Sequence, residues 1–281
     1  MNSPTALPQR VAKDPAAPTF GARLRAWRLR RHLSQLALAN DVEISTRHLS
    51  YMETGRANPS RDMLLRLTAK LEVPLRERNV FLLAAGFAPM YREAPLDDPA
   101  LADAKRAVEL ILKCHEPFPA LALDRHWNLV TANRMVAQFF TGVDESLLRP
   151  PINVLRLTFH PKGLAPSILN LPQWRAHLFE RLAHQIEATA DPVLVSLLAD
   201  LRSFPVPATD RTEHLQGEHL GVAAPLKIRS PVGVLSLIST TTVFGSPVDV
   251  TLQELALETF FPLDEFTTQT LHAMASALGS S

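Results

Sequence analysis

Residues 34–60, SQLALANDVEISTRHLSYMETGRANPS, decide the fold of the first part of the chain. Ser34 and Ser45 each precede a short run with helical apolar spacing, and a serine in that position caps free backbone N–H groups of a helix. Gly55 follows the second run, where a helix commonly ends. Two short capped helices joined by a tight turn predict a helix-turn-helix.

The second of these helices has two chemically different faces. At about 100° per residue, Leu49 and Met52 point to nearly the same side as Ser45. The polar side chains point away from that side: Thr46, Arg47, Ser50, Tyr51 and Thr54. One face therefore packs against the protein, and the other is free to contact bases.

The stretch resembles the lambda-repressor-like (XRE) DNA-binding domains. The matching positions are Gln35, Ala39, Ser45, Leu49, Ser50, Glu53, Gly55, Pro59 and Ser60. In that family the second helix enters the major groove with its N-terminal half on the bases. The resemblance implies base contacts for Thr46, Arg47 and Tyr51, and phosphate or groove-edge contacts for Gln35, Ser50 and Arg56. Arg25 of the first predicted helix is added as a further candidate. The candidate DNA-binding residues are therefore Gln35, Ser45, Thr46, Arg47, Ser50, Tyr51, Arg56 and Arg25.

Three further positions bear on this resemblance. Arg28 and Glu53 match a family ion pair that ties the first helix to the recognition helix, and the alternative is a solvated pair with little net effect. Glu43 stands in the turn where the family usually has glycine, and a positive φ there would cost a non-glycine residue roughly 1 kcal/mol. The alternative for the whole segment is a small helical bundle that binds no DNA.

Charge is unevenly distributed along the chain. The whole chain has a net charge of +1, but residues 1–90 contain 14 Lys and Arg against 7 Asp and Glu, a net of +7. Five arginines lie on or at the end of the first predicted helix: Arg23, Arg25, Arg28, Arg30 and Arg31. The excess of positive charge thus lies in the part of the chain that contains the motif, and such a field attracts phosphates.

Length and composition limit the class of protein. With 281 residues, 46% of them hydrophobic, the chain is long enough for two domains. No apolar run reaches 18 residues and no signal peptide precedes the motif, so we expect a soluble, cytoplasmic protein without a membrane partner. The single cysteine, Cys114, excludes an internal disulfide.

The chain is predicted to begin with a disordered leader over 1–18 and a five-helix, all-α DNA-binding domain over 19–88. Its helices are expected at about 20–31, 35–41, 45–54, 61–71 and 75–85. Phe20, Leu24 and Trp27 form the packing face of the first helix. The fourth and fifth are expected to pack through Leu64, Leu65, Leu67 and Leu71, and through Val80, Leu82 and Leu83. Prolines over 89–99 predict a linker.

Residues 100–281 show mixed periodicity. A helix is expected at about 100–114, strands at 119–124 and 127–133, and a helix capped by Asn133 through Phe139 and Phe140. A long helical region over 172–201 is broken near Asp191 and Pro192. Strands follow at 225–228 and 232–244, and residues 248–262 supply one more strand or an amphipathic segment. These elements predict an α+β domain with an antiparallel sheet.

This second part resembles a PAS-like fold and, together with the first, the MmyB-like transcription regulators. The segments that carry the resemblance are HLSYMETGRANPSRDMLLRL, RERNVFLLAAGFAP, PALALDRHWNLVTANR and the paired helices around Trp174. The resemblance implies an apolar cavity and fatty-acid-type ligands. The candidate ligand-binding residues are Leu121, Leu123, Phe139, Phe140, Trp174, Leu178 and Val234.

Other reactive side chains do not form a convincing site. Adjacent residues such as Cys114 and His115 point in different directions on a helix, which is poor geometry for a nucleophile and its base. The pairs His177 with His184 and His214 with His219 have no cysteine or carboxylate at ligand spacing. The sequence has no glycine-rich phosphate loop, which argues against a nucleotide-dependent enzyme. From these observations together we expect no cofactor, no metal and no enzyme activity.

The sequence thus predicts a DNA-binding transcription regulator, a homodimer on double-stranded DNA, whose second domain senses a small apolar ligand. One alternative gives that domain a purely structural, dimerising role, and another makes it an apolar-pocket enzyme or carrier. An empty apolar cavity would favour the sensor, a filled core the scaffold, and a titratable pair converging in the cavity the enzyme.

Overall fold

The computed structural model describes residues 18–205, 224–245, 247 and 249–279. The chain divides into two compact units, Met1–Glu93 with Val248–Val250, and Ala94–Pro247 with Thr251–Ser281. Residues 1–17 of the predicted leader, and both His214 and His219, lie outside the described residues. None of the described helices is long and apolar enough to cross a membrane.

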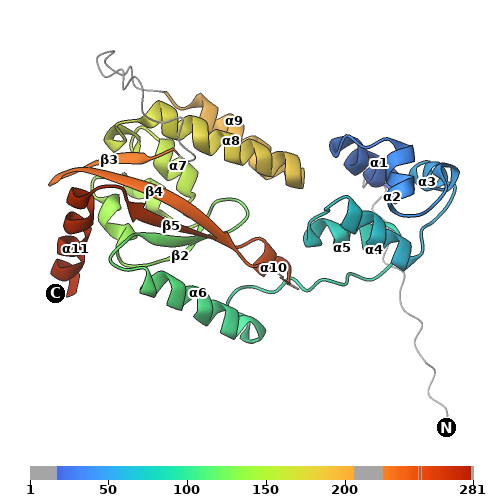
Figure 1. Cartoon of the computed structure of the whole chain (residues 1–281), viewed down its shortest axis with the longest axis horizontal. Coiled ribbons are helices and arrows are strands. Elements are labelled where there is room, and N and C mark those ends of the chain that lie inside the picture. Colours follow the sequence, from blue (N-terminus) through green and yellow to red (C-terminus); the bar gives the residue numbers. More distant parts are fainter. Residues whose placement is uncertain (1–17, 206–223, 246, 248, 280–281) are drawn as a thin grey trace, which may run out of the picture. The chain divides into compact units, whose positions relative to one another are not determined.

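Within residues 18–93 the structure confirms the five predicted helices (Figure 1). They are α1 (Phe20–Arg30), α2 (Gln35–Asp41), α3 (Thr46–Glu53), α4 (Arg61–Lys70) and α5 (Leu75–Ala84). Ser34 Oγ accepts from the backbone N–H of Ala37 at 3.0 Å, and Ser45 Oγ accepts from that of His48 at 3.1 Å. These bonds satisfy donors that the first turn of a helix leaves unpaired, so the two serines determine where α2 and α3 begin.

The turn between α2 and α3 contains Glu43 at a φ of 57°. The N–H of Ile44 donates to the carbonyl of Ala39 at 2.9 Å, and the N–H of Glu43 donates to that of Asn40 at 3.2 Å. This pair of bonds is a Schellman motif, which requires a left-handed residue directly after the helix cap. The turn therefore has the geometry that glycine would favour, with a glutamate in place.

The core of the first unit follows the predicted spacing with one error. Phe20, Leu24 and Trp27 of α1 are buried, as predicted. On α5, however, Leu83 is 44% exposed, whereas Phe81 is fully buried with its ring centre 5.7 Å from that of Phe20. The prediction of Leu83 was wrong because α5 turns Phe81 and Leu82 toward the core, and the next residue lies a further 100° around the helix.

Close contact between α1 and α3 depends on Gly21. A Cβ atom at this position would overlap the backbone carbonyl of Met52 and lie 2.5 Å from that of Glu53. Glycine therefore lets α1 lie directly against the C-terminal end of α3.

The chain after α5 is held to the first unit by a side chain. Asn79 Oδ1 accepts from the N–H groups of Met90 and Tyr91 at 2.9 and 3.0 Å, and Asn79 Nδ2 donates to the carbonyl of Tyr91 at 2.6 Å. Arg92 then pairs with Asp249 in an isolated parallel bridge. Part of the segment predicted as a linker is thus fixed to this unit, and its role as a linker stays a prediction.

The second unit combines an antiparallel sheet with helices (green to red in Figure 1). Its strands are β1 (Ala120–Leu123), β2 (Leu129–Ala132), β3 (Leu226–Ser230), β4 (Gly233–Val243) and β5 (Ala256–Pro262). Its α-helices are α6 (Ala102–Cys114), α7 (Val154–Phe159), α8 (Leu171–Thr189), α9 (Pro192–Ser203), α10 (Val250–Gln253, beginning in the first unit) and α11 (Glu265–Gly279). Short 3-10 helices are η1 (Pro99–Leu101), η2 (Val136–Phe140), η3 (Glu145–Leu148) and η4 (Ala165–Ser167).

The strands are arranged in the order β2-β1-β5-β4-β3, and each neighbouring pair is antiparallel. This confirms the predicted α+β class, the hairpin over 119–133 and the strands at 225–228 and 232–244. The break in the long helical region is also present, because Ala190 has a φ of 58° and Asp191 caps α9. The narrower PAS-like assignment stays a prediction.

The two faces of the sheet belong to two apolar cores. In β1, Ala120 and Ala122 pack on the side of α6, while Leu121 and Leu123 join the larger core formed with α7, α8 and α9. Figure 1 shows α8 and α9 side by side over one face of the sheet and α6 over the other. Because successive strand residues point to opposite faces, every second residue of β1 and β5 faces the larger core.

For this unit the prediction of a helix capped by Asn133 was wrong, and one helix was missed. Asn133 does not cap a helix: its Oδ1 accepts from the N–H of Ala120 at 3.2 Å, and its Nδ2 donates to the carbonyls of Leu112 and Phe118 at 3.1 and 2.8 Å. The segment with Phe139 and Phe140 is the 3-10 helix η2. The C-terminal helix α11, which packs on β4 and β5, was not predicted.

Candidate functional site

The outer face of α3 gathers two arginines around one aromatic ring. Arg47 Nε donates to the Tyr51 hydroxyl at 2.9 Å, and the guanidinium carbon of Arg47 lies 5.3 Å from the ring centre. The guanidinium carbon of Arg56 lies 5.9 Å from the same ring. Stacking restricts where a long arginine side chain can lie, and both arginines are exposed. The structure thus brings together three of the predicted DNA-binding residues with cationic donors facing solvent.

The remaining candidates on α3 lie on or beside this face. Ser45 holds the helix start through its bond to the N–H of His48, so its hydroxyl is already engaged within the protein. Thr46 and Ser50 are half-buried along the helix. Contact of these residues with DNA stays a prediction.

A buried ion pair fixes α3 to α1. Arg28 Nε lies 2.6 Å from Glu53 Oε1, Arg28 Nη2 lies 3.0 Å from Glu53 Oε2, and the two side chains are only 8% and 2% exposed. The predicted pair is therefore present, and the alternative of a solvated pair is wrong. Gln35 Nε2 also donates to Glu53 Oε2, at 2.8 Å, so this predicted phosphate-contacting side chain is tied to the same carboxylate.

The surroundings of Glu53 change its acidity. Burial raises the pKa of this carboxyl, but hydrogen bonds from Arg28 and Gln35 and the positive charges of Arg28 and Arg25 outweigh burial. The net result is a pKa below the ordinary value. The folded first unit thus favours the ionised carboxylate.

The arginines of α1 are not equivalent, although the sequence suggested one common field. Arg28 is buried, and Arg31 donates to the backbone carbonyls of Leu71 and Glu72 at 2.9 and 3.2 Å. Arg25 is exposed. Of these three, Arg25 is the one whose position suits a phosphate contact.

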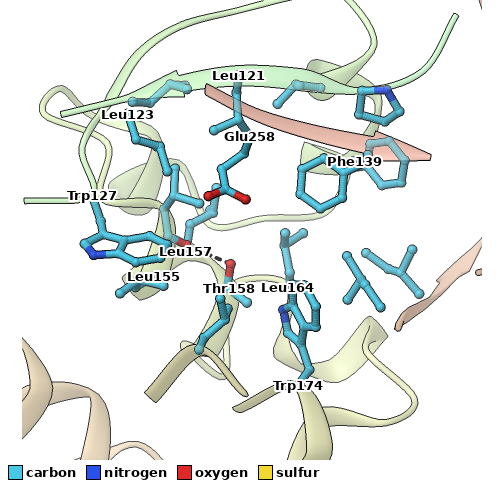
Figure 2. Close-up of a pocket in the computed structure, with 18 of the residues that line it drawn as sticks. Leu121, Leu123, Trp127, Phe139, Leu155, Leu157, Thr158, Leu164, Trp174 and Glu258 are labelled. Carbon is cyan, nitrogen blue, oxygen red and sulfur yellow. Dashed lines mark hydrogen bonds between the residues drawn. The ribbon is translucent and has the colours of Figure 1, made fainter. Parts of the chain in front are cut away.

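The second unit contains a largely apolar cavity of about 100 Å³, partly open to solvent, between the sheet and helices α7 and α8. Leu121 and Leu123 of β1, Phe139 and Phe140 of η2, and Trp174 and Leu178 of α8 line it. Six of the seven predicted ligand-binding residues therefore surround one space (Figure 2).

Val234 is the exception, and its prediction as a lining residue was wrong. Val234 is 40% exposed, whereas Leu235 and Leu237 in the same strand are buried and Leu237 lines the cavity. Both faces of β4 carry apolar residues, so the sequence pattern did not reveal which residues face inward.

Sequence reasoning missed the charged part of the cavity wall. Arg181 of α8 and Glu258 of β5 both line the cavity and pair at 2.6 Å between Nη2 and Oε1. Thr241 donates to Glu258 Oε1 at 2.7 Å, and the Arg181 guanidinium carbon lies 4.9 Å from the Trp127 ring centre. One signal in the sequence could have revealed Arg181 as a lining residue: it lies seven residues after Trp174, and therefore on the same face of the helix.

Trp127, which forms another wall, lies in the loop between β1 and β2. It has a φ of 66°, and its Nε1 donates to Gln185 Oε1 of α8 at 2.8 Å. Asp124 Oδ1 accepts from the N–H groups of His126 and Asn128, both at 2.8 Å, which stabilises this tight loop.

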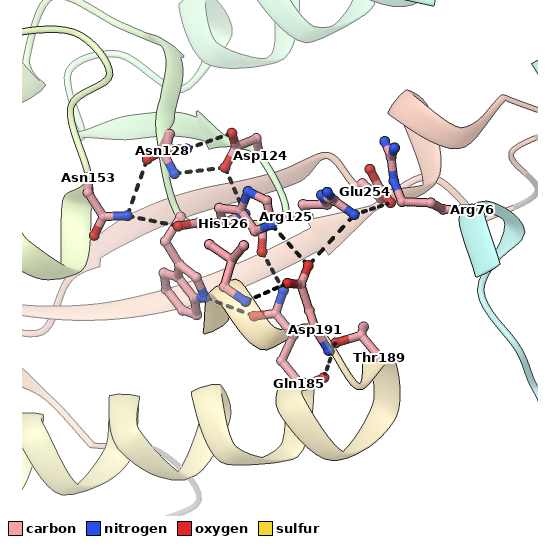
Figure 3. Close-up of polar contacts among 12 residues, drawn as sticks. Arg76, Asp124, Arg125, His126, Asn128, Asn153, Gln185, Thr189, Asp191 and Glu254 are labelled. Carbon is pink, nitrogen blue, oxygen red and sulfur yellow. Dashed lines mark hydrogen bonds and ion pairs between the residues drawn. The ribbon is translucent and has the colours of Figure 1, made fainter. Parts of the chain in front are cut away.

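The same loop is attached to the start of α9. His126 Nε2 lies 2.9 Å from Asp191 Oδ2, and Gln185 Nε2 donates to the carbonyl of Arg125 at 2.8 Å. Figure 3 shows these polar groups gathered beside the turn between α8 and α9. The loop that carries Trp127 is thus bonded to the helical layer through Arg125 and His126, and the indole itself through its Nε1.

The other described histidines named from the sequence, His115, His177 and His184, do not converge with the cysteine. His115 Nε2 hydrogen-bonds with the carbonyl of Phe260 at 2.8 Å, while Cys114 is exposed. His177 is half-buried, and burial together with the charge of Arg181 holds its pKa below the ordinary value, whereas His184 is exposed. Among the described residues, no group of three or more His, Cys, Asp or Glu side chains is placed to hold a metal ion.

Comparison with protein families matches both units. Residues 19–81 match a helix-turn-helix domain, and residues 104–274 match the MmyB-like transcription regulator ligand binding domain. No curated protein matches the sequence. Because the second match covers more than half of the chain, the chain belongs to the MmyB-like transcription regulators, with a helix-turn-helix domain followed by the ligand-binding domain.

Proposed function

We propose that this protein is a sequence-specific DNA-binding regulator whose operator affinity depends on a small apolar ligand in the cavity of the second unit. The observation that carries the proposal is the cavity itself, about 100 Å³ and lined mainly by leucine, phenylalanine and tryptophan side chains, within a domain of a ligand-binding family. The DNA-binding part is supported by the two exposed arginines stacked on Tyr51.

The proposed ligand is like a fatty acid in having one apolar chain with one polar end. A cavity of about 150 Å³ lined by apolar side chains holds benzene, so a space of about 100 Å³ suits a short chain. A long chain requires the cavity to widen. We therefore expect short-chain ligands to bind this conformation and longer ones to bind with a structural change.

We further propose that the regulator binds as a homodimer on an inverted repeat. A single short recognition helix contacts only a few base pairs, which gives little specificity in a genome. Two copies would place their recognition helices about one DNA turn, roughly 34 Å, apart. Footprinting on a selected operator tests this: two protected half-sites with that spacing support the dimer, and one isolated half-site occupied by a monomer contradicts it.

The alternatives for the second unit rest on different observations. A purely structural, dimerising domain would have a filled core, and the cavity argues against that. An enzyme or carrier is suggested by the titratable pair Arg181 and Glu258 in the cavity wall. However, an arginine does not exchange protons in the physiological range, so this pair provides at most one proton-transfer group.

Mass spectrometry of small molecules extracted from the purified full-length protein tests the proposal. We expect an apolar molecule in stoichiometric amount, or uptake of short- and medium-chain fatty acids and their alcohols in calorimetry. Recovery of the added molecule unchanged after incubation distinguishes a sensor from an enzyme. Absence of both a co-purified molecule and any uptake would contradict the ligand-binding proposal.

A further inference from the structure

The cavity wall contains a carboxylate in an unusual place. Glu258 lies in β5, a central strand, and it is 5% exposed. Its neighbours Leu257 and Thr259 point to the opposite face, while Glu258 and Phe260 face the cavity. Figure 2 shows the Glu258 side chain extending from the strand beside Leu121 into the space above Thr158.

The two oxygens of this carboxylate are satisfied unequally. Oε1 accepts from Arg181 Nη2 at 2.6 Å and from Thr241 Oγ1 at 2.7 Å. Oε2 has a longer contact, 3.4 Å, with Arg181 Nη1. A carboxylate accepts about four hydrogen bonds in total, so Oε2 retains capacity for a strong donor.

A structural role alone does not explain the pair. Removing two charges from water is costly, and apolar residues of similar volume in place of a buried ion pair often leave a fold equally stable or more stable. The pair lies where the sheet faces the cavity, and Arg181 is also stacked on Trp127. Its position therefore favours a role in recognising what enters the cavity.

We propose that Glu258 selects the polar end of the ligand, accepting a hydrogen bond from a neutral hydroxyl group through Oε2 and disfavouring a carboxylate. A ligand carboxylate would lie beside the negative charge of Glu258 and compete with it for Arg181, and like charges repel. An ammonium group would meet the positive charge of Arg181. A hydroxyl donates to Glu258 without disturbing the pair.

This inference rests on the proposed function and specifies the head group of the proposed ligand. It identifies Glu258 as a specificity-determining residue and Arg181 with Thr241 as the residues that position it. The ligand class is an alcohol with a short apolar chain.

Calorimetry on the full-length protein at neutral pH, with three chain-matched probes, tests the inference. The probes are hexan-1-ol, its isomer methyl pentyl ether, which has no hydrogen-bond donor, and hexanoate. We expect the wild type to bind hexan-1-ol about tenfold or more tightly than either other probe, because a hydrogen bond to a charged group contributes at least a factor of that order.

Two variants and one control assign the preference to Glu258. In Glu258→Gln the disadvantage of hexanoate should shrink, because the negative charge is gone while the side-chain shape remains. In the double variant Glu258→Leu with Arg181→Met, the alcohol and the ether should bind almost equally. Glu116→Gln removes a carboxylate that pairs with Arg134 at 2.9 Å and is not part of the cavity wall, so it should keep the wild-type preference.

The outcomes separate this inference from the proposed function. If hexanoate binds the wild type as tightly as hexan-1-ol, or if the preference for the alcohol over the ether persists in the folded double variant, the head-group inference is wrong and the apolar-ligand proposal stands. If none of the three probes binds the wild type, the head-group inference is wrong, and the apolar-ligand proposal is wrong as well if the purified protein also carries no small molecule and takes up no longer chain.

Discussion

Arg28 in α1 and Glu53 at the end of α3 form a two-bond ion pair, at 2.6 and 3.0 Å, across 25 residues of sequence. Because Arg47 and Tyr51 lie on the same helix as Glu53, this pair sets the orientation of the proposed DNA-binding face. Gly21 permits the close approach of the two helices on which the pair depends.

Replacement of Glu53 by glutamine should destabilise the first unit by about 3–5 kcal/mol, because it leaves the buried guanidinium of Arg28 without its counter-charge. Hydrogen exchange of the α1 and α3 amides, measured by mass spectrometry, resolves this unit from the second. We expect faster exchange in α1 and α3 and unchanged exchange in β1 and β5. Equal exchange in wild type and variant would show that the pair contributes little.

The same carboxylate predicts how stability depends on pH. Since the pKa of Glu53 in the folded state lies below the ordinary value of 4.5, its contribution is fully present above about pH 4.5 and is lost as the pH falls through the folded pKa. Urea denaturation of wild type and Glu53→Gln over a pH series should show a stability difference that narrows below pH 4.5. A difference that stayed constant down to the lowest pH would contradict this assignment.

Specificity should depend on Arg47 and general affinity on Arg25. Arg47→Ala should cost about 1–3 kcal/mol at the cognate site and relax base preference, if the guanidinium contacts a guanine with two bonds. Arg25→Ala should weaken binding to all sequences alike. Titrations on duplexes selected from a random pool and on scrambled ones distinguish the two, and a uniform loss for Arg47→Ala would remove it from the base-contacting residues.

Filling the cavity should abolish ligand uptake. Leu237→Trp places a larger ring in the cavity wall, at a cost in stability of about 1–3 kcal/mol from overpacking. Val234→Trp is the matched control, because Val234 lies three residues earlier in the same strand but does not line the cavity. Calorimetry with hexan-1-ol should show binding in wild type and control only; unchanged binding in Leu237→Trp would place the ligand elsewhere.

The helices of the first unit could be predicted because their signals are local. Ser34 and Ser45 cap the helices that follow them, and the spacing of Phe20, Leu24 and Trp27 fixes one packing face. The Arg28–Glu53 pair was predicted from family resemblance, since 25 residues separate the partners. The burial of Phe81 in place of Leu83 could not be predicted because the rotation of a helix depends on its neighbours.

The ligand cavity was predicted in its apolar part only. Trp174 and Leu178 are recognisable as one face of α8, but the pairing of Arg181 with Glu258 joins residues 77 apart in sequence. Such a pair depends on the packing of α8 over β5, which no local pattern contains. Val234 was misplaced for a related reason, because strand alternation gives two faces without identifying the inner one.

The most direct test of the account is the operator affinity of the full-length protein measured with and without a cavity ligand. A ligand regulates only if it binds the DNA-competent and DNA-incompetent states unequally, and a coupling of about 1–3 kcal/mol changes affinity roughly 5- to 150-fold. We predict a change of that size with saturating hexan-1-ol or a medium-chain analogue, and none in Leu237→Trp. An operator affinity that stays the same while calorimetry shows the cavity occupied would contradict the account.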